Sequence, residues 1–270
     1  MLRSPLDRPI GPMLRFALRN RINVITALVL RDMRTRFGRS HLGYLLAIMW
    51  PLSHLTVMVG GMVYMRRVSP LGGDPVVFAV TGILPYILCL YPARMMGYAM
   101  ELNRALLFFP VIRPMDIIVS RAIVELFTAS IVVLLVFSIA LVAGFDLVPM
   151  DSHILVSGIM ATVFLSLSMG FFNNIALSIS KAWNIIFVTL LISMYISSGV
   201  VIPVAVLPEE IQYIISFNPL FHSVEWLRSA YFEDSSYYML SKTYLLGVGL
   251  AFMLLGLMGE RFLRGKMLVS

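Results

Sequence analysis

Residues 117–144 read IIVSRAIVELFTASIVVLLVFSIALVAG, with Arg121 and Glu125 as the only charged side chains in the run. A bilayer core of about 30 Å needs about 20 consecutive apolar residues of helix, so this segment is long enough to cross it. Each backbone polar group left unsatisfied in hydrocarbon costs several kcal/mol, which restricts such a segment to a helix. The run therefore predicts a membrane-spanning helix.

Five further apolar blocks of spanning length lie on either side of this one. Together they give six predicted transmembrane helices, at 42–65, 75–100, 117–144, 153–180, 183–206 and 242–262. The composition agrees, because 59% of the residues are hydrophobic, 13% are charged and the mean hydropathy is +0.89. The sequence predicts an all-α membrane protein in which residues 41–270 form one six-helix transmembrane domain.

Basic residues gather on one side of the predicted helices. Nine arginines precede the first block, and the same side would hold Arg104, Arg113, Lys181, Arg261, Arg264 and Lys266. The opposite side holds Arg66, Arg67, Arg228 and Lys242. The positive-inside rule then places both termini in the cytoplasm. Because the net charge of +7 lies beside spanning segments, it favours attraction to anionic membrane lipids over binding of nucleic acid.

Several catalytic and nucleotide-binding motifs are missing. Gly265-Lys266 is not part of a G-x-x-x-x-G-K-[ST] phosphate loop, because Met267 follows it and the upstream glycine is lacking. H-E-x-x-H, C-x-x-C and G-x-S-x-G are also absent, and the single Cys89 excludes an intrachain disulfide. Residues 1–21 have no apolar stretch typical of a cleavable signal. We expect no enzymatic site, cofactor or metal in this chain; any ATP and Mg²⁺ would bind a separate subunit.

The first forty residues, 1–40, predict an amphipathic helix. Apolar residues recur at helical spacing, namely Leu14, Leu18, Ile22, Ile25, Leu28 and Val29, and the arginines lie largely off this stripe. The apolar run 24–30 is too short to span a bilayer, so the helix would lie in the membrane interface. Two interpretations are open: a general membrane anchor, and a gate or collar at the cytoplasmic mouth of a channel.

Residues 101–116, ELNRALLFFPVIRPMD, form a short connector on the predicted cytoplasmic side. Glu101 and Asn103 can cap one or two helical turns, and the prolines Pro110 and Pro114 prevent a long helix. The connector carries an unusual apolar face for a cytoplasmic loop, made of Leu102, Leu106, Leu107 and Phe109. It either packs on the ends of its own bundle or inserts as a knob into a groove on a cytoplasmic partner.

Residues 198–232, SGVVIPVAVLPEEIQYIISFNPLFHSVEWLRSAYF, contain two helix starts. Pro208 is expected at the first helical position with the acidic pair 209–210 in the first turn, and Asn218 is an N-cap followed by Pro219 at the first helical position of the second helix. Each predicted helix, of about 8 and 13 residues, is too short to span the membrane. They predict a re-entrant hairpin over 207–235 on the outer side, shielded by protein or by a water-filled cavity.

Charged and amide side chains at membrane depth need partners. Arg121 and Glu125 stand one helical turn apart, so an ion pair is expected, while a polar lining for a hydrated path is the alternative. Arg94 lies at a similar depth. Asn173 and Asn174 predict hydrogen bonds between helices.

Three stretches resemble the ABC-2 permeases, the membrane subunits of ABC exporters that move large polymers. TRFGRSHLGYLLAIMWP (35–51) is similar to the opening of the capsular-polysaccharide branch of this family, and NRALLFFPVIRPMDIIVSR (103–121) to the family's coupling region. The SG…P…LP…NP…E-x-x-R pattern within 198–232 resembles the family's outer segment. These stretches spread over about three-quarters of the chain.

The resemblance implies the protein's assembly and its place in the cell. The family implies a homodimer of six-helix subunits in the bacterial inner membrane, each bound to an ATPase subunit that holds ATP and Mg²⁺. It also implies a polysaccharide path along the dimer interface and contacts with periplasmic and outer-membrane export components. Export of O-antigen or teichoic acid is the alternative within the family, and a secondary transporter is the alternative outside it.

The resemblance also implies roles for individual residues. Aromatic rings can stack on the apolar faces of sugars, so candidate path residues are Tyr44, Trp50, Tyr86, Tyr91 and Tyr195, together with Arg94. For Tyr44 a position in the membrane-interface belt is the alternative. Candidate ATPase contacts are Asn103, Arg104, Leu106, Leu107 and Phe109. Candidate residues of an outer lid, hinged at Asn218-Pro219, are Pro208, Asn218, Pro219, Glu225 and Arg228, with the last two paired three residues apart on one helix.

Overall fold

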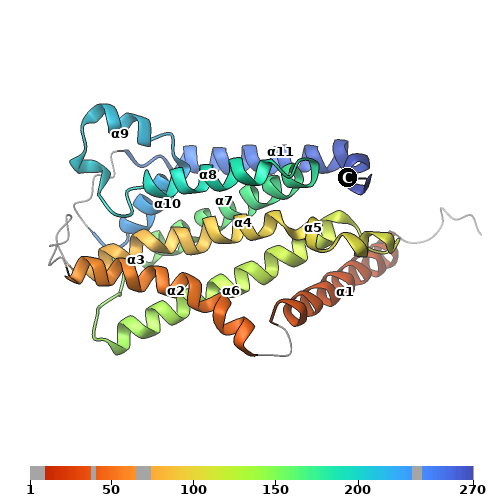
Figure 1. Cartoon of the computed structure of the whole chain (residues 1–270), viewed down its shortest axis with the longest axis horizontal. Coiled ribbons are helices and arrows are strands. Elements are labelled where there is room, and N and C mark those ends of the chain that lie inside the picture. The colour runs from red at the N-terminus through yellow and green to blue at the C-terminus, as the bar shows by residue number, and fades with distance from the viewer. Residues whose placement is uncertain (1–9, 38–40, 65–73, 233–238, 270) are drawn as a thin grey trace, which may run out of the picture.

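The computed structural model describes residues 10–37, 41–64, 74–232 and 239–269, and every regular element within these ranges is a helix. The long helices lie side by side and form an elongated bundle (Figure 1). They are α2 (His41–Tyr64), α6 (Pro114–Val142), α7 (Ser152–Ile179), α11 (Lys242–Val269) and a rod made of α3 (Pro75–Pro85), the π-helical turn η2 (Tyr86–Leu90) and α4 (Tyr91–Gly97). The predicted all-α fold is confirmed for the described residues.

Four helices in the described part of the chain are long and apolar enough to cross a membrane: Pro75–Gly97, Pro114–Val142, Ser152–Ile179 and Lys242–Phe262. They correspond to the second, third, fourth and sixth predicted blocks. The first block is α2, a helix of 24 residues whose side chains are described only in part. These helices are those of a multi-pass membrane protein.

The fifth block differs from the prediction of a helix over 183–206. α8 runs only over Trp183–Ile196, and its 14 residues reach about 21 Å, short of a bilayer core. The helix ends where Gly199 adopts a φ of +79°, a left-handed conformation typical of helix C-termini. Pro203, which has no N–H to donate, precedes the short 3-10 turn η4 (Val204–Val206).

The two short helices predicted after this block are present. α9 (Glu209–Ile215) has 7 residues and α10 (Pro219–Arg228) has 10. The side chain of Asn218 accepts a hydrogen bond of 2.9 Å from the Leu220 N–H, so the predicted N-cap is confirmed. Pro208 stands one position earlier than predicted, as the residue before the first helical turn of α9.

α7 is the central helix of the bundle, with α4 on one side and α11 on the other. Small residues allow α11 to approach closely, because a Cβ at Gly256 would lie 2.5 Å from the Phe171 ring. On the other side, Asn173 donates to the carbonyl of Ala93 and Asn174 to the carbonyl of Met96, at 3.2 and 2.9 Å. The predicted interhelical role of these asparagines is confirmed, at about 0.6–2 kcal/mol for each contact.

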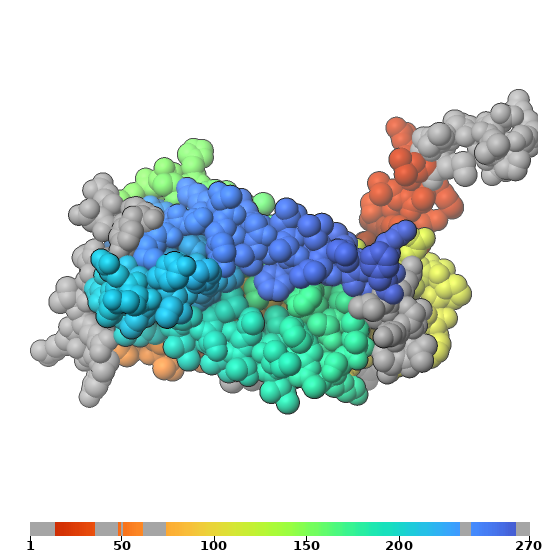
Figure 2. Space-filling model, turned by 90° about the horizontal axis from the view of Figure 1, so that it is seen from above, coloured from red at the N-terminus to blue at the C-terminus, as the bar shows by residue number. Residues whose placement is uncertain are grey.

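The helix predicted within residues 1–40 is α1 (Ile10–Phe37), which packs against α6 at one end of the bundle. In the space-filling view its red atoms stand out from the body (Figure 2). The connector between α4 and α6 lies at the same end (Figure 1). It consists of a single turn, α5 (Ala99–Leu102), and a 3-10 helix, η3 (Arg104–Phe108), so the prediction of one or two turns is confirmed.

Candidate functional site

An aromatic cluster lies near the middle of the rod Pro75–Gly97. The Nε2 atom of His54 in α2 and the hydroxyl of Tyr195 in α8 are 2.7 Å apart and share a hydrogen bond. The ring centroid of Tyr86 lies 5.0 Å from that of His54 and 5.1 Å from that of Tyr195. All three side chains are half-buried in the single chain. The cluster thus joins three helices and leaves part of its surface open.

The backbone around Tyr86 explains its position. Pro85 and Pro92 flank the stretch and carry no N–H, so the regular hydrogen-bond pattern of an α-helix cannot run through it. The chain widens into the π-helical turn η2, where the N–H of Tyr91 donates to the carbonyl of Tyr86, five residues back. Such bulges occur frequently at functional sites because they turn side chains out of the helical register.

The structure brings together two of the six candidate path residues, Tyr86 and Tyr195. Tyr91 is half-buried and Arg94 is exposed, on the following turns of α4. The side chains of Tyr44 and Trp50 lie outside the described residues. His54 is a member of the cluster that sequence analysis missed. The one available signal was a polar Ser53-His54 pair within an otherwise apolar block.

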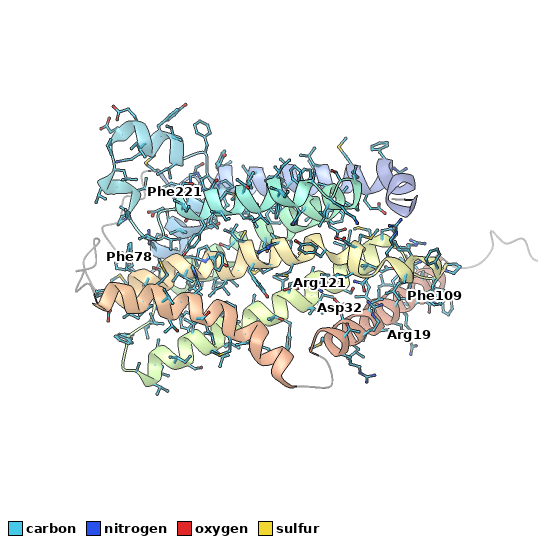
Figure 3. All side chains as sticks on the ribbon, viewed as in Figure 1. Arg19, Asp32, Phe78, Phe109, Arg121 and Phe221 are labelled. Carbon is cyan, nitrogen blue, oxygen red and sulfur yellow. The ribbon has the colours of Figure 1, made fainter. Side chains whose placement is uncertain are left out.

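The connector presents a different set of side chains from the one predicted. Asn103 is buried, and Leu106 and Leu107 are half-buried against the core. Arg104 is exposed, and so is Phe109, with 59% of its surface accessible. Figure 3 shows Phe109 at the end of the bundle opposite Phe78 and Phe221.

Further exposed apolar side chains of the connector were not predicted as contacts. They are Phe108, which is 86% accessible, and Val111; Leu102, which belongs to the predicted apolar face, is exposed as well. A cavity of about 220 Å³ adjoins them, with Glu101, Arg104 and Lys181 in its wall. The connector therefore offers an apolar knob next to a hollow with charged residues in its wall. The sequence did not tell the exposed apolar side chains of the connector from those that pack on the core, because hydrophobicity marks both kinds alike.

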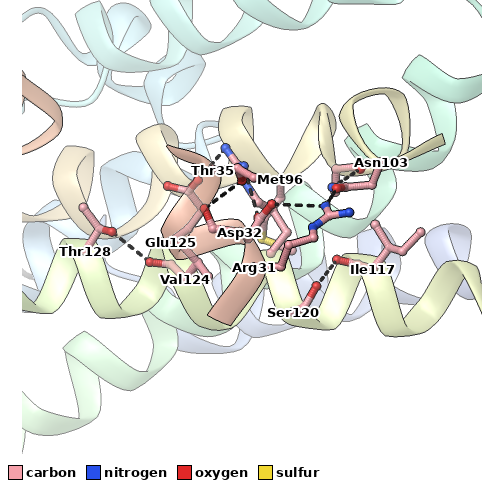
Figure 4. A network of polar contacts seen from close by, with 12 residues as sticks. Arg31, Asp32, Thr35, Met96, Asn103, Ile117, Ser120, Val124, Glu125 and Thr128 are labelled. Atoms are coloured by element: carbon pink, nitrogen blue, oxygen red, sulfur yellow. Dashed lines mark hydrogen bonds and ion pairs between the residues drawn. The ribbon is translucent and has the colours of Figure 1, made fainter. Parts of the chain in front are cut away.

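A buried charge network ties α6 to α1. Arg121 pairs with Glu125 at 2.8 Å, which confirms the predicted ion pair, and also lies 3.4 Å from Asp32 of α1 (Figure 4). All three side chains are buried. Asp32 was not predicted, although it is the only acidic residue in the basic helix α1.

At the opposite end, Arg228 of α10 is fully buried and forms the predicted pair with Glu225, at 3.4 Å. Its guanidinium also donates to the carbonyls of Gly199 and Val200, at 2.7 and 3.1 Å, and lies 4.0 Å from the centre of the Phe78 ring. These contacts fasten α10 to α3 and to the loop after α8.

Asn218 and Pro219 belong to the same fixed unit. The Asn218 side chain donates to the carbonyl of Met194 at 2.7 Å, and all residues from Leu220 to Arg228 are buried. α9 contrasts with this, because Pro208 and most of the helix are exposed. Only α9 has the exposure expected of a lid.

Comparison with known proteins places the chain in a family. Residues 23–232 match the model of the family described as ABC-2 type transporter. The chain is 29% identical over 249 residues to the polysialic acid transport protein KpsM of Escherichia coli, which covers 91% of this chain and 95% of that protein. It is 28% and 27% identical over 256 residues to the capsule polysaccharide export inner-membrane proteins CtrC of Neisseria meningitidis and BexB of Haemophilus influenzae, each covering 90% of this chain and 92% of the relative.

Replacing Arg228 by methionine should destabilise the protein by about 3–5 kcal/mol, because Glu225 would be left buried without its cation. The double variant Glu225→Met/Arg228→Met should lose less than Arg228→Met alone, since it leaves no unpaired charge. Thermal unfolding in detergent measures both effects. Arg94→Met, at an exposed arginine, is the control and should change stability by no more than about 0.5 kcal/mol. A double variant less stable than Arg228→Met would contradict the role of the pair.

Proposed function

Because the chain belongs to the ABC-2 type transporter family, we propose that it is the membrane-spanning permease of an ATP-driven exporter that moves lipid-linked capsular polysaccharide across the bacterial inner membrane. The observation that carries this proposal is the similarity, over nine-tenths of the chain, to proteins named for capsule polysaccharide export and polysialic acid transport. The aromatic cluster at membrane depth supports it, because stacking rings suit a sugar polymer.

The energy source would be a separate ATPase subunit that binds ATP and Mg²⁺, since the sequence has no phosphate loop of its own. The working assembly would be a homodimer of this chain with two ATPase subunits, joined to periplasmic and outer-membrane components. One bundle packed around α7 has little room for a polymer, so a path between two copies is the simpler arrangement.

The proposed topology has six spans: α2, the rod Pro75–Gly97, α6, α7, α8 and α11. Both termini and the connector would be cytoplasmic, and α9 and α10 would face the periplasm as a re-entrant segment. The excess of arginine before α2 and in the connector supports this orientation. The short α8 would be completed across the membrane by the turn and by α10, which packs against it.

The exposed knob of the connector, made of Leu102, Phe108, Phe109 and Val111, would dock into a groove on the ATPase. Large apolar side chains exposed at one end of a bundle are typical of an interaction surface. Arg104 and Glu101, beside the neighbouring cavity, would form the polar rim of this contact.

The His54–Tyr86–Tyr195 cluster would line the polysaccharide path. A histidine and two phenol groups in the middle of a span are costly to expose to lipid, so their open side is expected to face a water-filled cavity or a second copy. The ring faces would stack on sugar C–H groups, and the hydroxyls would bond to sugar oxygens. Tyr44, Trp50, Tyr91 and Arg94 are proposed as further path residues on the same two helical segments.

The outer gate would be α9, moving on a fixed base. Pro208 lies at its start, and Asn218 and Pro219 lie where the exposed helix meets the buried one. Glu225 and Arg228 would hold that base by their ion pair. The exposed α9 is the part of this segment with the fewest buried groups, and such parts open at low cost in free energy.

Cysteine labelling should confirm the orientation. On a Cys89→Ala background, Tyr213→Cys should react with a membrane-impermeant maleimide in spheroplasts, whereas Phe109→Cys should react only in inverted vesicles. The two side chains are similarly exposed, at 66% and 59%, so accessibility within the fold does not bias the comparison. Labelling at position 109 in sealed spheroplasts would refute the topology.

Phe109→Asp should leave the chain in the membrane but prevent its co-purification with an ATPase and abolish export. A carboxylate in the ATPase groove would be desolvated without a partner, which costs several kcal/mol. Ile214→Asp, the same change at an exposed residue of α9, is the control and should leave co-purification intact. If the Phe109 variant binds ATPase and exports as the unmodified protein does, the connector is not the docking element.

Tyr86→Ala should slow export about 3- to 10-fold, the loss expected for one aromatic stacking contact. Binding of the ATPase and ATP hydrolysis should remain, since Tyr86 lies in the rod before the connector, about 20 Å of helix away from it. Polymer transfer into proteoliposomes measures the rate, and Phe127→Ala, at an exposed ring of α6, serves as the comparison. Equal export rates for the two variants would count against the proposed path.

A further inference from the structure

α1 holds both ends of the connector. Near the connector's end, Arg21 donates to the carbonyl of Val111 at 3.0 Å and pairs with Asp116 at 2.8 Å. Near its beginning, Arg31 donates to the side-chain oxygen of Asn103. Ten residues separate the two arginines, a distance of about 15 Å along the helix. α1 therefore runs antiparallel to the connector and spans nearly its whole length.

Apolar contacts fill the space between the two polar ties. Val24 and Leu28 of α1 belong to the same cluster as Leu106, Leu107 and Ile112. This packing covers the inner side of the connector, so the outer side remains for the exposed phenylalanines. The connector is thus held between α1 and whatever binds its outer face.

A third tie continues from α1 into the bundle. The carboxylate of Asp32 lies 3.4 Å from the guanidinium of Arg121 in α6 and 3.7 Å from that of Arg31 (Figure 4). Arg121 in turn pairs with Glu125 on its own helix. Buried charges that satisfy one another resist separation, because parting them would leave each unpaired in a poorly solvated place. From Arg21 onward, α1 is therefore fixed to the connector and to α6 together.

The N-terminal part of α1 that precedes Arg21 is exposed wherever its side chains are described. Its side chains from Leu14 to Asn20 are all exposed, and Leu14, Phe16 and Leu18 are each at least 60% accessible. Figure 2 shows red atoms of α1 standing away from the bundle. α1 is thus one continuous helix that is clamped from Arg21 onward and has a free N-terminal part over residues 14–20, which is the form of a lever.

We propose that Arg21, Arg31 and Asp32 make α1 the element that carries movement of the connector to the cytoplasmic mouth of the path. When the ATPase displaces the connector, the three ties force α1 to move with it, and the free N-terminal part sweeps across the membrane surface. The three residues are positioning residues, because they act through the connector and do not touch the polymer. This inference rests on the proposed docking of an ATPase on the connector.

The test follows a probe on the free N-terminal part of α1. Leu18→Cys on the Cys89→Ala background is labelled with a thiol-reactive fluorophore in the complex with the co-purified ATPase, in nanodiscs. We expect the emission to change when ATP and vanadate are added. Introducing Arg21→Glu should abolish at least nine-tenths of this change and reduce export at least 10-fold, while the ATPase stays bound. Arg21→Lys should retain most of the response.

Arg19→Glu is the matched control. It makes the same charge change two residues away on the same helix, at an exposed side chain that makes none of the three ties (Figure 3). It should leave the nucleotide response unchanged. Arg31→Gln, which cuts the other tie, should repeat the effect of Arg21→Glu and serves in its place if that variant does not reach the membrane.

The possible outcomes separate the lever role of α1 from the proposed function. A full probe response in assembled Arg21→Glu or Arg31→Gln complexes would overturn the lever, as would an equal loss in Arg19→Glu. If the unmodified protein binds the ATPase and exports polymer but its probe is insensitive to nucleotide, the lever fails and the proposed function stands. If the unmodified protein binds no ATPase, the proposed function itself fails.

Discussion

Hydrocarbon offers no partner to a charge, so every ionised side chain among spanning helices needs one inside the protein. Arg121 finds Glu125 on its own helix and Asp32 on α1, and Arg228 finds Glu225 and two backbone carbonyls. Each arginine thereby decides where a peripheral segment docks. The first sets α1 against the end with the connector, and the second sets α10 against α3 at the opposite end. The regular packing around α7 supplies the scaffold between them.

The two ends differ in how firmly their parts are held, and this difference bears on transport. At one end the connector is backed by α1 and by apolar packing, so a force applied to its exposed phenylalanines is passed on to α1 and the core. At the other end, α10 is buried while α9 lies outside it with an exposed apolar surface. A firmly supported connector end and a loosely held α9 end suit a transporter in which the ATPase acts on one side of the membrane and the substrate leaves on the other.

The features predicted from the sequence were those fixed by residues close together in the chain. The pairs Arg121–Glu125 and Glu225–Arg228 follow from spacings of four and three on a helix, and the start of α10 follows from Asn218-Pro219. The contacts of Asp32 with Arg121, and of His54 with Tyr195, join residues about 90 and 140 positions apart. Hydrophobic pattern locates such helices but not their rotation about their own axes, so these contacts stayed out of reach. For the same reason Leu106 and Leu107 could not be told from the exposed Phe108.

The early end of α8 depends on hydrogen bonds from the segment that begins and forms α10. A helix that stops within the apolar region leaves carbonyl groups that water would otherwise satisfy. Here Asn218 donates to the carbonyl of Met194, and Arg228 donates to those of Gly199 and Val200. The side chains that cap α10 and neutralise Glu225 are thus the same ones that complete α8. Because α8 also carries Tyr195, the geometry of the aromatic cluster depends on a buried arginine of α10, more than 30 residues further along the chain.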